Sequence, residues 1–539
     1  MIVGSTVTWA PWPGYRCHAT SARSPSAETA TTRPRGSAAL SNSRRVTSSP
    51  RRKGSSVRSM ASSSRPTDAA TAAPAMRESA KIFPCRPRGT WPKDRCPASA
   101  RALPPEGRMR RVSWAVVVLA ALGVIAAGGH QLPSAFSNAT GEARTLAPAA
   151  IDTGNAFFQP LGANGRACGT CHLPSDGWSL TPATAQRLFD ASDGRHPLFR
   201  PRDGANAPNL PDTTTAERRA AHSLLLTRGV IRVGLPIPPD ADFTLEGVDD
   251  PYGFASAKEL SLYRRPLPST NLAFLSSVMW DGRESRTGGS IAAHLAQQAT
   301  GATDGHAQGA VLSDEQRQAI VAFERSLVTT QSRDALADDL GAAGAHGGPQ
   351  ALAEQAFFPG INSSREPGGF NRRVFSLFGD WAQAAGAFAA ARQAVARGEQ
   401  IFNTHAFAGG NFTCTTCHNA PNAGSNSLGK MFDLGLGAES RRPPDVPLYT
   451  LRCVRAGQAS PSGRVVRTTD PGAALVTGRC DDIGRFKVPT LRGLAARAPY
   501  FHNGSAATLD DVVTFYDTRF AIRLTPGERA DLVAFLRAL

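Results

Sequence analysis

The sequence predicts a mainly α-helical, loop-rich protein built from two tandem domains of the same kind. Three observations lead to this fold class. A Cys-x-x-Cys-His motif occurs twice, at residues 168–172 and 414–418. Each copy closes with an amphipathic helix, and the two helices match in sequence. Strand candidates are few, within IRVGLPI (231–237) and ALVTG (474–478), while 51 Gly and 40 Pro residues favour long connecting loops.

The first fifth of the chain differs in composition from the rest. Residues 1–111 hold 21 of the 60 Lys and Arg residues but 5 of the 43 Asp and Glu residues, and so carry nearly all of the net charge of +17. This stretch shows no apolar period and cannot bury enough surface to offset its chain entropy. We expect residues 1–108 to be a disordered leader or a misassigned start. Since the body after it is nearly neutral, no nucleic-acid partner is predicted.

Residues 109–135 have the organisation of a secretory signal peptide. The run MRRVSW places basic residues directly before the apolar run AVVVLAALGVIAA, and small residues follow. We therefore predict that Met109 is the true start and that the body is exported to the periplasm, with this segment as its one contact with the membrane. A basic tail ahead of an uncleaved anchor is the alternative interpretation.

The body contains six cysteines, of which four belong to the two Cys-x-x-Cys motifs. The remaining two, Cys453 and Cys480, are an even pair, and an exported protein meets an oxidising environment. We expect a disulfide between them. Two unpaired buried thiols are the alternative.

Both copies end in a helix of the same design. Residues 312–327 and 524–539 align without gaps and match at seven of sixteen positions. Ser313 and Thr525 are N-cap residues, and a Gln or Glu three positions later completes a capping box in each. A stripe of apolar residues at helical spacing then predicts one buried face per helix.

Three kinds of site use a Cys-x-x-Cys pair. A thioredoxin-like redox pair follows a strand in a βαβ pattern and does not require the adjacent His. A zinc site needs four ligands, whereas these pairs lie 246 residues apart. A c-type haem accounts for every element, because two thiols bind its vinyl groups and the adjacent His binds its iron. We therefore predict two covalently bound c-type haems, held by Cys168, Cys171, His172, Cys414, Cys417 and His418.

Two cytochrome c-type domains follow from this duplication, one at residues 145–330 and one at residues 391–539. The first contains an insert at residues 183–265 that has no counterpart of similar length in the second. Residues 331–390 join the two domains as a linker and interface segment, because their Gly- and Ala-rich part is typical of a linker.

Two further runs carry a resemblance to a known family. Residues 489–517 read PTLRGLAARAPYFHNGSAATLDDVVTFYD, and residues 279–284 read MWDGRE. Together with the Cys-x-x-Cys-His motifs, they resemble the bacterial dihaem cytochrome c peroxidases over roughly residues 150–539. The family includes the dihaem enzyme that matures methylamine dehydrogenase by oxidising protein tryptophans. The resemblance implies that the N-terminal haem reacts with hydrogen peroxide and that the C-terminal haem accepts electrons from a small donor protein.

The resemblance assigns a role to Tyr516. Counted from the PYFH motif, this residue stands where the sixth ligand of the C-terminal haem is Met in the electron-accepting peroxidases and Tyr in the tryptophan-oxidising relative. An anionic phenolate lowers the reduction potential and favours oxidised, high-valent iron. Met431, or no protein ligand, is the alternative at that iron.

The same resemblance places Trp280 between the two haems as a bridge for charge; the alternative is a packing role. The peroxidases carry a distal Glu that handles protons during O–O cleavage, and here its position falls on Gln308. Gln cannot act as a general acid or base. His306, two residues earlier, can, and it is also able to ligate the iron.

The resemblance also implies a calcium ion between the haems, but the sequence departs from that pattern. Pro499 matches one backbone-carbonyl ligand, while Arg497 replaces the usual Thr. Arg265 or Pro266 stands where an Asn ligand is expected. A carbonyl ligand can come from any residue, whereas a nearby Arg repels a cation, so the sequence leaves calcium binding open.

The sequence therefore predicts an exported dihaem c-type oxidoreductase with peroxidase-like activity. Its partners would be hydrogen peroxide and a small electron donor, either a cytochrome c or a cupredoxin, or a substrate protein. A non-catalytic dihaem electron-transfer protein is one alternative. A maturation-type oxidase that acts on a partner protein is the other.

Overall fold

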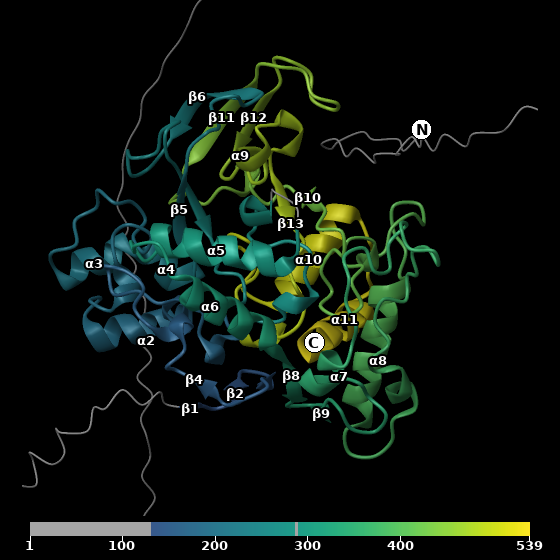
Figure 1. Ribbon diagram of the computed structural model, residues 1–539. Coiled ribbons are helices and arrows are strands. Elements are labelled where there is room, and N and C mark those ends of the chain that lie inside the picture. The colour runs from purple at the N-terminus through teal and green to yellow at the C-terminus, as the bar shows by residue number, and fades with distance from the viewer. Residues whose placement is uncertain (1–130, 286–288) are drawn as a thin grey trace, which may run out of the picture. The chain divides into compact units, whose positions relative to one another are not determined.

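The structure is a computed structural model that describes residues 131–285 and 289–539 (Figure 1). Its α-helices are α2 (Pro182–Ser192), α3 (Thr215–Ala221), α4 (Ser223–Arg228), α5 (Ile291–Gly305), α6 (Asp314–Ser326), α7 (Gly348–Ala353), α8 (Ala389–Thr404), α9 (Ala474–Thr477), α10 (Leu509–Phe520) and α11 (Pro526–Ala538). Its strands are β1 (Gln131–Leu132), β2 (Ala135–Asn138), β3 (Gly141–Leu146), β4 (Ile151–Asp152), β5 (Ile231–Leu235), β6 (Phe243–Asp249), β7 (Leu260–Arg264), β8 (Val328–Asp334), β9 (Asp338–Asp339), β10 (Met431–Asp433), β11 (Leu448–Cys453), β12 (Val465–Thr468) and β13 (Arg485–Lys487).

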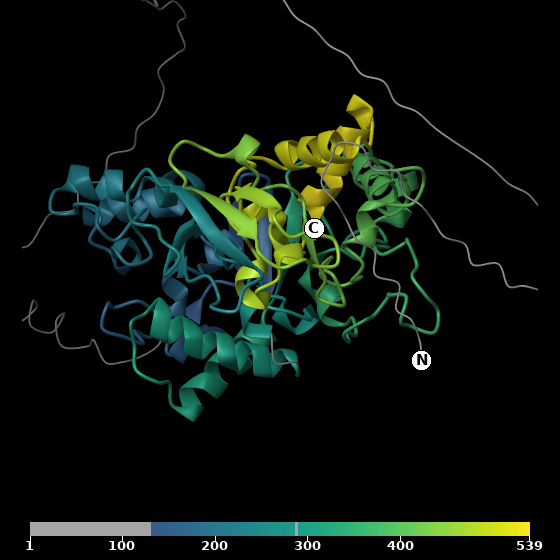
Figure 2. The same cartoon turned by 90° about the horizontal axis from the view of Figure 1, so that it is seen from above.

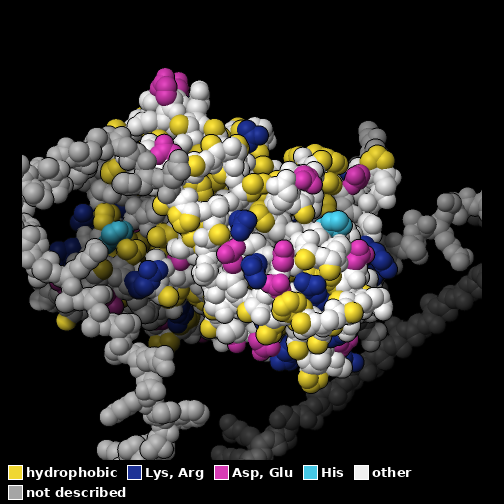
Figure 3. All heavy atoms as spheres, turned by 90° about the horizontal axis from the view of Figure 1, so that it is seen from below, with side chains coloured by type: hydrophobic (Ala, Val, Ile, Leu, Met, Phe, Trp, Pro, Cys, Tyr) yellow, Lys and Arg dark blue, Asp and Glu magenta, His cyan; other side chains and the backbone are white. Residues whose placement is uncertain are grey.

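The predicted leader and most of the predicted signal peptide lie outside the described residues. In the part of the chain that the structure describes, no helix is both long and apolar enough to cross a membrane. On the face shown in Figure 3, basic and acidic side chains are interspersed, as the nearly neutral composition of the body leads one to expect.

The predicted mainly α fold is wrong, because strands form a substantial part of the structure. Helices account for 34% and strands for 17% of the described residues. The strands form a four-stranded sheet in the order β2-β3-β8-β9 and a three-stranded sheet in the order β12-β11-β6. Three two-stranded sheets pair β1 with β4, β5 with β7, and β10 with β13.

The missed strands have polar residues at buried positions. Thr145 of β3 and Thr329 of β8 are both buried, and their hydroxyl oxygens lie 2.8 Å apart in a hydrogen bond. The hydroxyl of Thr270 makes a second hydrogen bond of 2.8 Å to Thr329, and the side-chain amide of Asn271 donates to the Thr329 carbonyl at 2.7 Å. Hydrogen bonds here replace apolar contacts, so a search for hydrophobic alternation finds no strand.

The two strand candidates had different outcomes. The run at residues 231–237 contains β5, as predicted. The run at residues 474–478 was wrongly predicted, because it forms the short helix α9, which ends at Gly478 in the left-handed conformation with φ of 70°. A short apolar run has no period long enough to separate strand from helix.

The insert at residues 183–265 adds a strand to the sheet of the second half. β6 pairs antiparallel with β11, with Phe243 opposite Cys453 and Leu245 opposite Leu451. Figure 1 shows β6 in teal beside the yellow-green β11 and β12. Cys453 and Cys480 form a disulfide within the apolar cluster that this sheet covers. The insert therefore packs the first half of the chain against the second.

The helices α8 and α11 are in close contact at Gly398. A Cβ atom on Gly398 would clash with the carbonyl oxygen of Asp531 and the Cβ atom of Phe535, both in α11. The two helices lie at the right of Figure 2, in green and yellow. Trp381 and Phe378, from the segment that joins the halves, complete the core around them.

Both terminal helices begin where the sequence predicted. In α6, the hydroxyl of Ser313 accepts a hydrogen bond from the backbone N–H of Gln316 at 3.2 Å. In α11, the hydroxyl of Thr525 accepts one from the backbone N–H of Glu528 at 3.2 Å. In each helix the Gln or Glu side chain bonds back to the N-cap backbone, which completes the capping box.

Candidate haem sites

Each Cys-x-x-Cys-His motif forms one turn of 3-10 helix with the same internal hydrogen bonds. These turns are η2 (Cys168–Thr170) and η8 (Cys414–Thr416). The backbone N–H of Ala167 donates to the hydroxyl of Thr170 at 2.9 Å, and that of Thr413 donates to the hydroxyl of Thr416 at 3.0 Å. The duplication seen in the sequence is therefore also a duplication of local structure.

The ring of each motif histidine is held by a backbone carbonyl six residues downstream. Nδ1 of His172 lies 3.2 Å from the carbonyl oxygen of Trp178, and Nδ1 of His418 lies 2.5 Å from that of Gly424. A proton on Nδ1 leaves Nε2 free to bind iron. Burial lowers the pKa of both imidazoles to about 4, which favours the neutral form that ligates metals.

A pair of phenylalanines packs beside each of these histidines. The ring centroid of Phe157 lies 6.4 Å from that of the first motif histidine and 5.1 Å from that of Phe323 in α6. The corresponding distances for Phe402 are 6.0 Å to the second motif histidine and 5.5 Å to Phe535 in α11. Since Phe323 and Phe535 are aligned positions of the two terminal helices, each of these helices supports one motif.

Tyr516 lies near the cysteines of the second motif. It belongs to α10, which begins at the predicted cap, where Thr508 accepts a hydrogen bond from the Asp511 backbone at 3.1 Å. Burial raises the pKa of Tyr516, and the nearby Cys417 and Cys414 raise it further. The side chain of Tyr516 is half-buried, and its ring centroid lies 6.1 Å from that of Phe501. The alternative ligand, Met431, instead lies against Gly282, in the loop that follows Trp280.

His306 lies at the first site and is oriented by Asp203. Nδ1 of His306 is 2.9 Å from the Asp203 carboxylate, which also pairs with Arg166 at 3.4 Å. The pKa of Asp203 is lowered overall. Burial alone would raise it, but the hydrogen bond to His306 and the charges of His306 and Arg166 have the larger effect. Nη1 of Arg166, two residues before Cys168, donates to the backbone carbonyl of His306 at 3.1 Å, which holds His306 beside the first motif.

Gln308 is not part of this arrangement. Its side chain is exposed, and its backbone has a left-handed φ of 52°. Its backbone carbonyl accepts a hydrogen bond from the N–H of Ala163 at 3.3 Å. His306 and Gln308 were the two distal candidates predicted from the sequence. Asp203 and Arg166 were not predicted, because Asp203 lies in the insert, 103 residues before its histidine.

Trp280 contacts both halves of the chain. Its indole Nε1–H donates to the backbone carbonyl of Arg265 at 2.8 Å, and its own carbonyl accepts from the backbone N–H of Lys487 at 2.8 Å. Its ring centroid is 6.2 Å from that of His502, a buried residue of the second half. The predicted bridging tryptophan therefore lies at the boundary between residues of the two halves.

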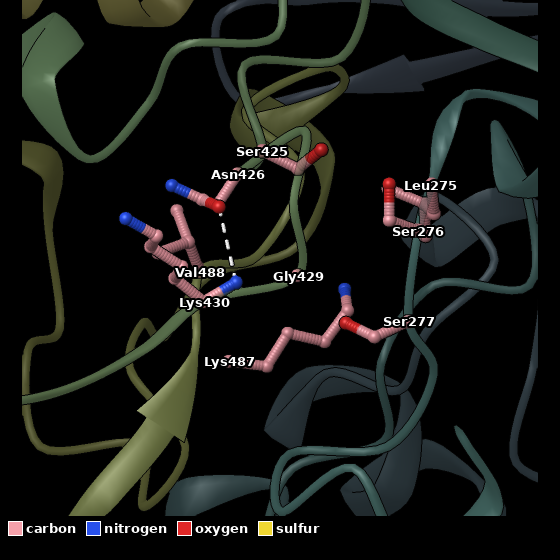
Figure 4. A pocket seen from close by; sticks show the side chains of 9 residues that line it. All are labelled: Leu275, Ser276, Ser277, Ser425, Asn426, Gly429, Lys430, Lys487 and Val488. Atoms are coloured by element: carbon pink, nitrogen blue, oxygen red, sulfur yellow. Dashed lines mark hydrogen bonds between the residues drawn. The ribbon is translucent and has the colours of Figure 1, made fainter. Parts of the chain in front are cut away.

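A small pocket opens beside this boundary (Figure 4). The residues that line it are Leu275, Ser276, Ser277, Ser425, Asn426, Gly429, Lys430, Lys487 and Val488. The side chain of Asn426 accepts from the Lys430 backbone at 3.0 Å, shown dashed in Figure 4, and donates to the Cys417 carbonyl at 3.1 Å. The pocket wall is therefore continuous with the second motif, and Lys487 runs toward Ser277 inside it.

Four buried cations of this region form no ion pair with a described carboxylate. They are Arg265, Lys487, Arg492 and Arg497. Burial is the main cause that lowers the pKa of Lys487 to about 8, of Arg265 to about 9, and of Arg492 and Arg497 to about 10. Arg265 and Arg497 donate to backbone carbonyls. Nη2 of Arg492 has no hydrogen-bond partner among the described residues. It is therefore available to an anionic group, and haem carries two carboxylates. Thiols, neutral imidazoles and unpaired cations together fit a c-type haem.

The residues present do not fit the calcium site that the resemblance implied. Nη2 of Arg265 donates to the carbonyl of Arg497 at 3.0 Å, and Nη1 donates to the carbonyl of Arg228 at 3.2 Å. A guanidinium thus already occupies the carbonyl at the position of the family's Thr. Within the described ranges, no group of three or more His, Cys, Asp or Glu side chains could hold a metal ion.

Glu324 is a buried carboxyl group that the sequence analysis missed. It lies on α6 with 3% of its surface exposed, and its Oε2 atom has no hydrogen-bond partner among the described residues. Burial raises the pKa of Glu324 to about 8, and its charge adds to the raised pKa of the Cys168 thiol. In the sequence it occupies an ordinary position of an amphipathic helix, so no local signal marks it.

Comparisons with known proteins bear on these sites. No family model matches the chain. Cytochrome-c peroxidase IdrP1 of Pseudomonas sp. (strain SCT) is 34% identical over 158 residues, which cover 26% of this chain and 39% of the relative. Cytochrome c551 peroxidase of Nitrosomonas europaea is 33% identical over 129 residues, 23% of this chain and 30% of the relative.

A solved structure, that of a MauG-like protein associated with microbial copper homeostasis, aligns with a TM-score of 0.34 and 16% identity, over 71% of this chain and 86% of that one. The chain spans less than half the length of the curated relatives it matches. Their names imply haem c as the cofactor, in agreement with the two motifs. Over the matched quarter of its length, the chain is similar to bacterial proteins named cytochrome-c peroxidases.

Proposed function

We propose that this chain is an exported dihaem c-type oxidoreductase that reduces hydrogen peroxide with electrons from a small cytochrome c or a cupredoxin. The observation that carries the proposal is the pair of equivalent motif histidines, each oriented by a carbonyl, with the acid–base group His306 beside the first. When bound, haem c supplies the redox chemistry at each site. The partial similarity to cytochrome-c peroxidases supports the same assignment.

At the first site, His306 would move the proton that peroxide cleavage requires. Since Asp203 holds Nδ1 of His306, Nε2 is left to take a proton from one peroxide oxygen and return it to the departing oxygen. Arg166 helps to keep Asp203 ionised, and the carboxylate stabilises the protonated imidazole between these two steps. Gln308 would take no part, because it is exposed and cannot exchange a proton.

At the second site, His418 would hold the iron of the electron-accepting haem and Tyr516 would be its sixth ligand. The phenol is half-buried and lies near Cys417 and Cys414, which supports this assignment. Trp280 would carry electrons between the haems, because it is bonded to both halves at once.

Tyr516 also favours a second candidate function, a maturation-type oxidase that acts on a partner protein. An anionic phenolate stabilises oxidised iron and makes the second haem a poor acceptor from a weak donor. A non-catalytic electron carrier is the third candidate, and it would require His306 to ligate the first iron and close that site.

Export to the periplasm is part of the proposal. It is supported by the Cys453–Cys480 disulfide, since disulfides persist in oxidising compartments, and by the signal-like run at residues 109–135.

Steady-state peroxide consumption with a reduced cytochrome c as donor tests the proposal on the haem-loaded protein. We expect turnover by the wild type and none by the Cys168→Ser, Cys171→Ser variant, which cannot anchor the first haem. The matched control is the Cys453→Ser, Cys480→Ser variant, which loses two cysteines remote from the motifs and should retain turnover per folded molecule. A wild type with both haems bound that consumes no peroxide would contradict the assignment, and oxidation of a partner tryptophan instead would support the second candidate.

A further inference from the structure

We propose that the guanidinium of Arg265 is a built-in cation that joins the two haem-bearing halves and positions Trp280 between them, in the place of a bound metal ion. The proposal deepens the proposed function, because it rests on Trp280 as the path for electrons between the haems.

Arg265 is bonded to the second half through both its backbone and its side chain. Its backbone N–H donates to the carbonyl of His502 at 2.6 Å, and its Nη2 donates to the carbonyl of Arg497 at 3.0 Å. Its Nη1 donates to the carbonyl of Arg228 in the first half at 3.2 Å. One guanidinium therefore connects backbone carbonyls from both halves, as a divalent cation bound by carbonyl oxygens would.

The same residue holds the indole of Trp280. The Arg265 carbonyl accepts the Nε1–H of Trp280 at 2.8 Å, while the Trp280 carbonyl is held by the backbone of Lys487 on β13. The side chain of Trp280 is thus fixed by the first half and its backbone by the second. A shift of Arg265 would release the indole from one of these two supports.

The environment of the guanidinium is built for a cation without an acidic partner. Arg265 is 5% exposed and forms no ion pair with any carboxylate in the described chain. Its charged and titratable neighbours are Arg497, Asp176 and Tyr500, and of these only the backbone carbonyl of Arg497 bonds to the guanidinium. The carbonyl dipoles of Arg497 and Arg228 therefore provide most of its direct stabilisation.

A glycine keeps the space for this side chain open. At Gly229, which has a left-handed φ of 60°, a Cβ atom would lie 2.5 Å from Nη1 of Arg265. The backbone conformation favours glycine, and any side chain there would displace the guanidinium. Because a tethered guanidinium cannot dissociate, contact between the halves should not depend on free divalent cations.

The rate of electron transfer between the haems, measured after rapid reduction of one haem, tests the proposal. We expect EDTA to leave the rate of the wild type unchanged. Arg265→Ala should lower it at least tenfold, and millimolar guanidinium ion, which fits the vacated space, should restore part of it. Arg265→Lys keeps the charge but cannot reach two carbonyls in a fixed geometry, so its rate should fall by a smaller factor and should not respond to guanidinium.

Arg218→Ala is the matched control. Arg218 is also a buried arginine that donates to carbonyls, but its acceptors, Asp193, Asp212 and Thr213, all belong to the first half. The Arg218→Ala variant should be less stable than the wild type and should keep the wild-type rate of electron transfer between the haems. Equal rates in the Arg265 and Arg218 variants would overturn the proposal, as would a wild-type rate that falls on chelation and recovers with calcium. The measurement uses no peroxide, so a failure of the peroxidase assignment would not affect it.

Discussion

The Nδ1 atom of His306 lies 2.9 Å from the carboxylate of Asp203, which joins the end of α5 to the insert of the first half. Loss of a positioned general acid–base group slows a proton-transfer step about 10²–10⁴-fold. We therefore expect His306→Gln to lower the rate of reaction with peroxide by about this factor, and Asp203→Asn to lower it less. Stopped-flow absorbance of the haem measures both rates. Gln308→Ala is the control, and a loss in this variant equal to that of His306→Gln would contradict the assignment.

Tyr516→Met should raise the reduction potential of the second haem and change its absorption spectrum. The reason is that a neutral thioether stabilises reduced iron, whereas an anionic phenolate stabilises oxidised iron. A spectroelectrochemical titration measures both properties. The control is Tyr500→Phe, since Tyr500 is a half-buried tyrosine of the same half whose hydroxyl donates to the Leu494 carbonyl at 3.0 Å. An unchanged spectrum in Tyr516→Met would remove Tyr516 from the iron.

Glu324 should make the protein less stable as the pH rises. Its pKa is about 8 in the folded chain against an ordinary 4.5, so between these values the folded state keeps a proton that the unfolded state releases. The free energy of unfolding from this group then falls by up to about 1.4 kcal/mol per pH unit across that window. Glu324→Gln should flatten this slope in urea unfolding at pH 5 and pH 8. The same slope in wild type and Glu324→Gln would show that Glu324 is ionised in the folded state. The control is Glu315→Gln, because Glu315 is exposed on the same helix, and this variant should keep the slope of the wild type.

Gly398→Ala should destabilise the second half. Its Cβ atom would clash with the backbone of Asp531, and overpacking of this kind costs about 1–3 kcal/mol. Gly527→Ala is the matched control, because Gly527 lies in α11 with open space around it. There, the higher helix propensity of alanine should stabilise by up to about 1 kcal/mol. Thermal unfolding followed by circular dichroism distinguishes the two, and equal effects would contradict the close contact of α8 with α11.

The duplicated parts of the structure could be predicted because their signals are local. Each Cys-x-x-Cys-His motif and each capping box occupies a few consecutive residues, and Ser313 and Thr525 cap helices where the sequence placed them. Tyr516 and Trp280 are candidates through the resemblance, because each lies in a run typical of the peroxidase family, and their roles at the haems stay predictions.

The parts that could not be predicted depend on contacts between distant segments. Asp203 meets His306 across 103 residues, and the role of Arg265 depends on carbonyls of Arg497 and Arg228. The strands β3 and β8 are stabilised by hydrogen bonds between buried threonines, which leave no apolar period in the sequence. The fold class was therefore wrong at the strands, where hydrogen bonds rather than apolar alternation decide the structure.

EPR and resonance Raman spectra of the haem-loaded protein test the central claim most directly. The claim is that the first haem is open to peroxide and that the second is six-coordinate. The proposed function predicts that, after partial reduction, the first haem gives a high-spin signal that one equivalent of hydrogen peroxide abolishes, while the second stays low-spin until its electron is used. Two low-spin haems that do not respond to peroxide would contradict it.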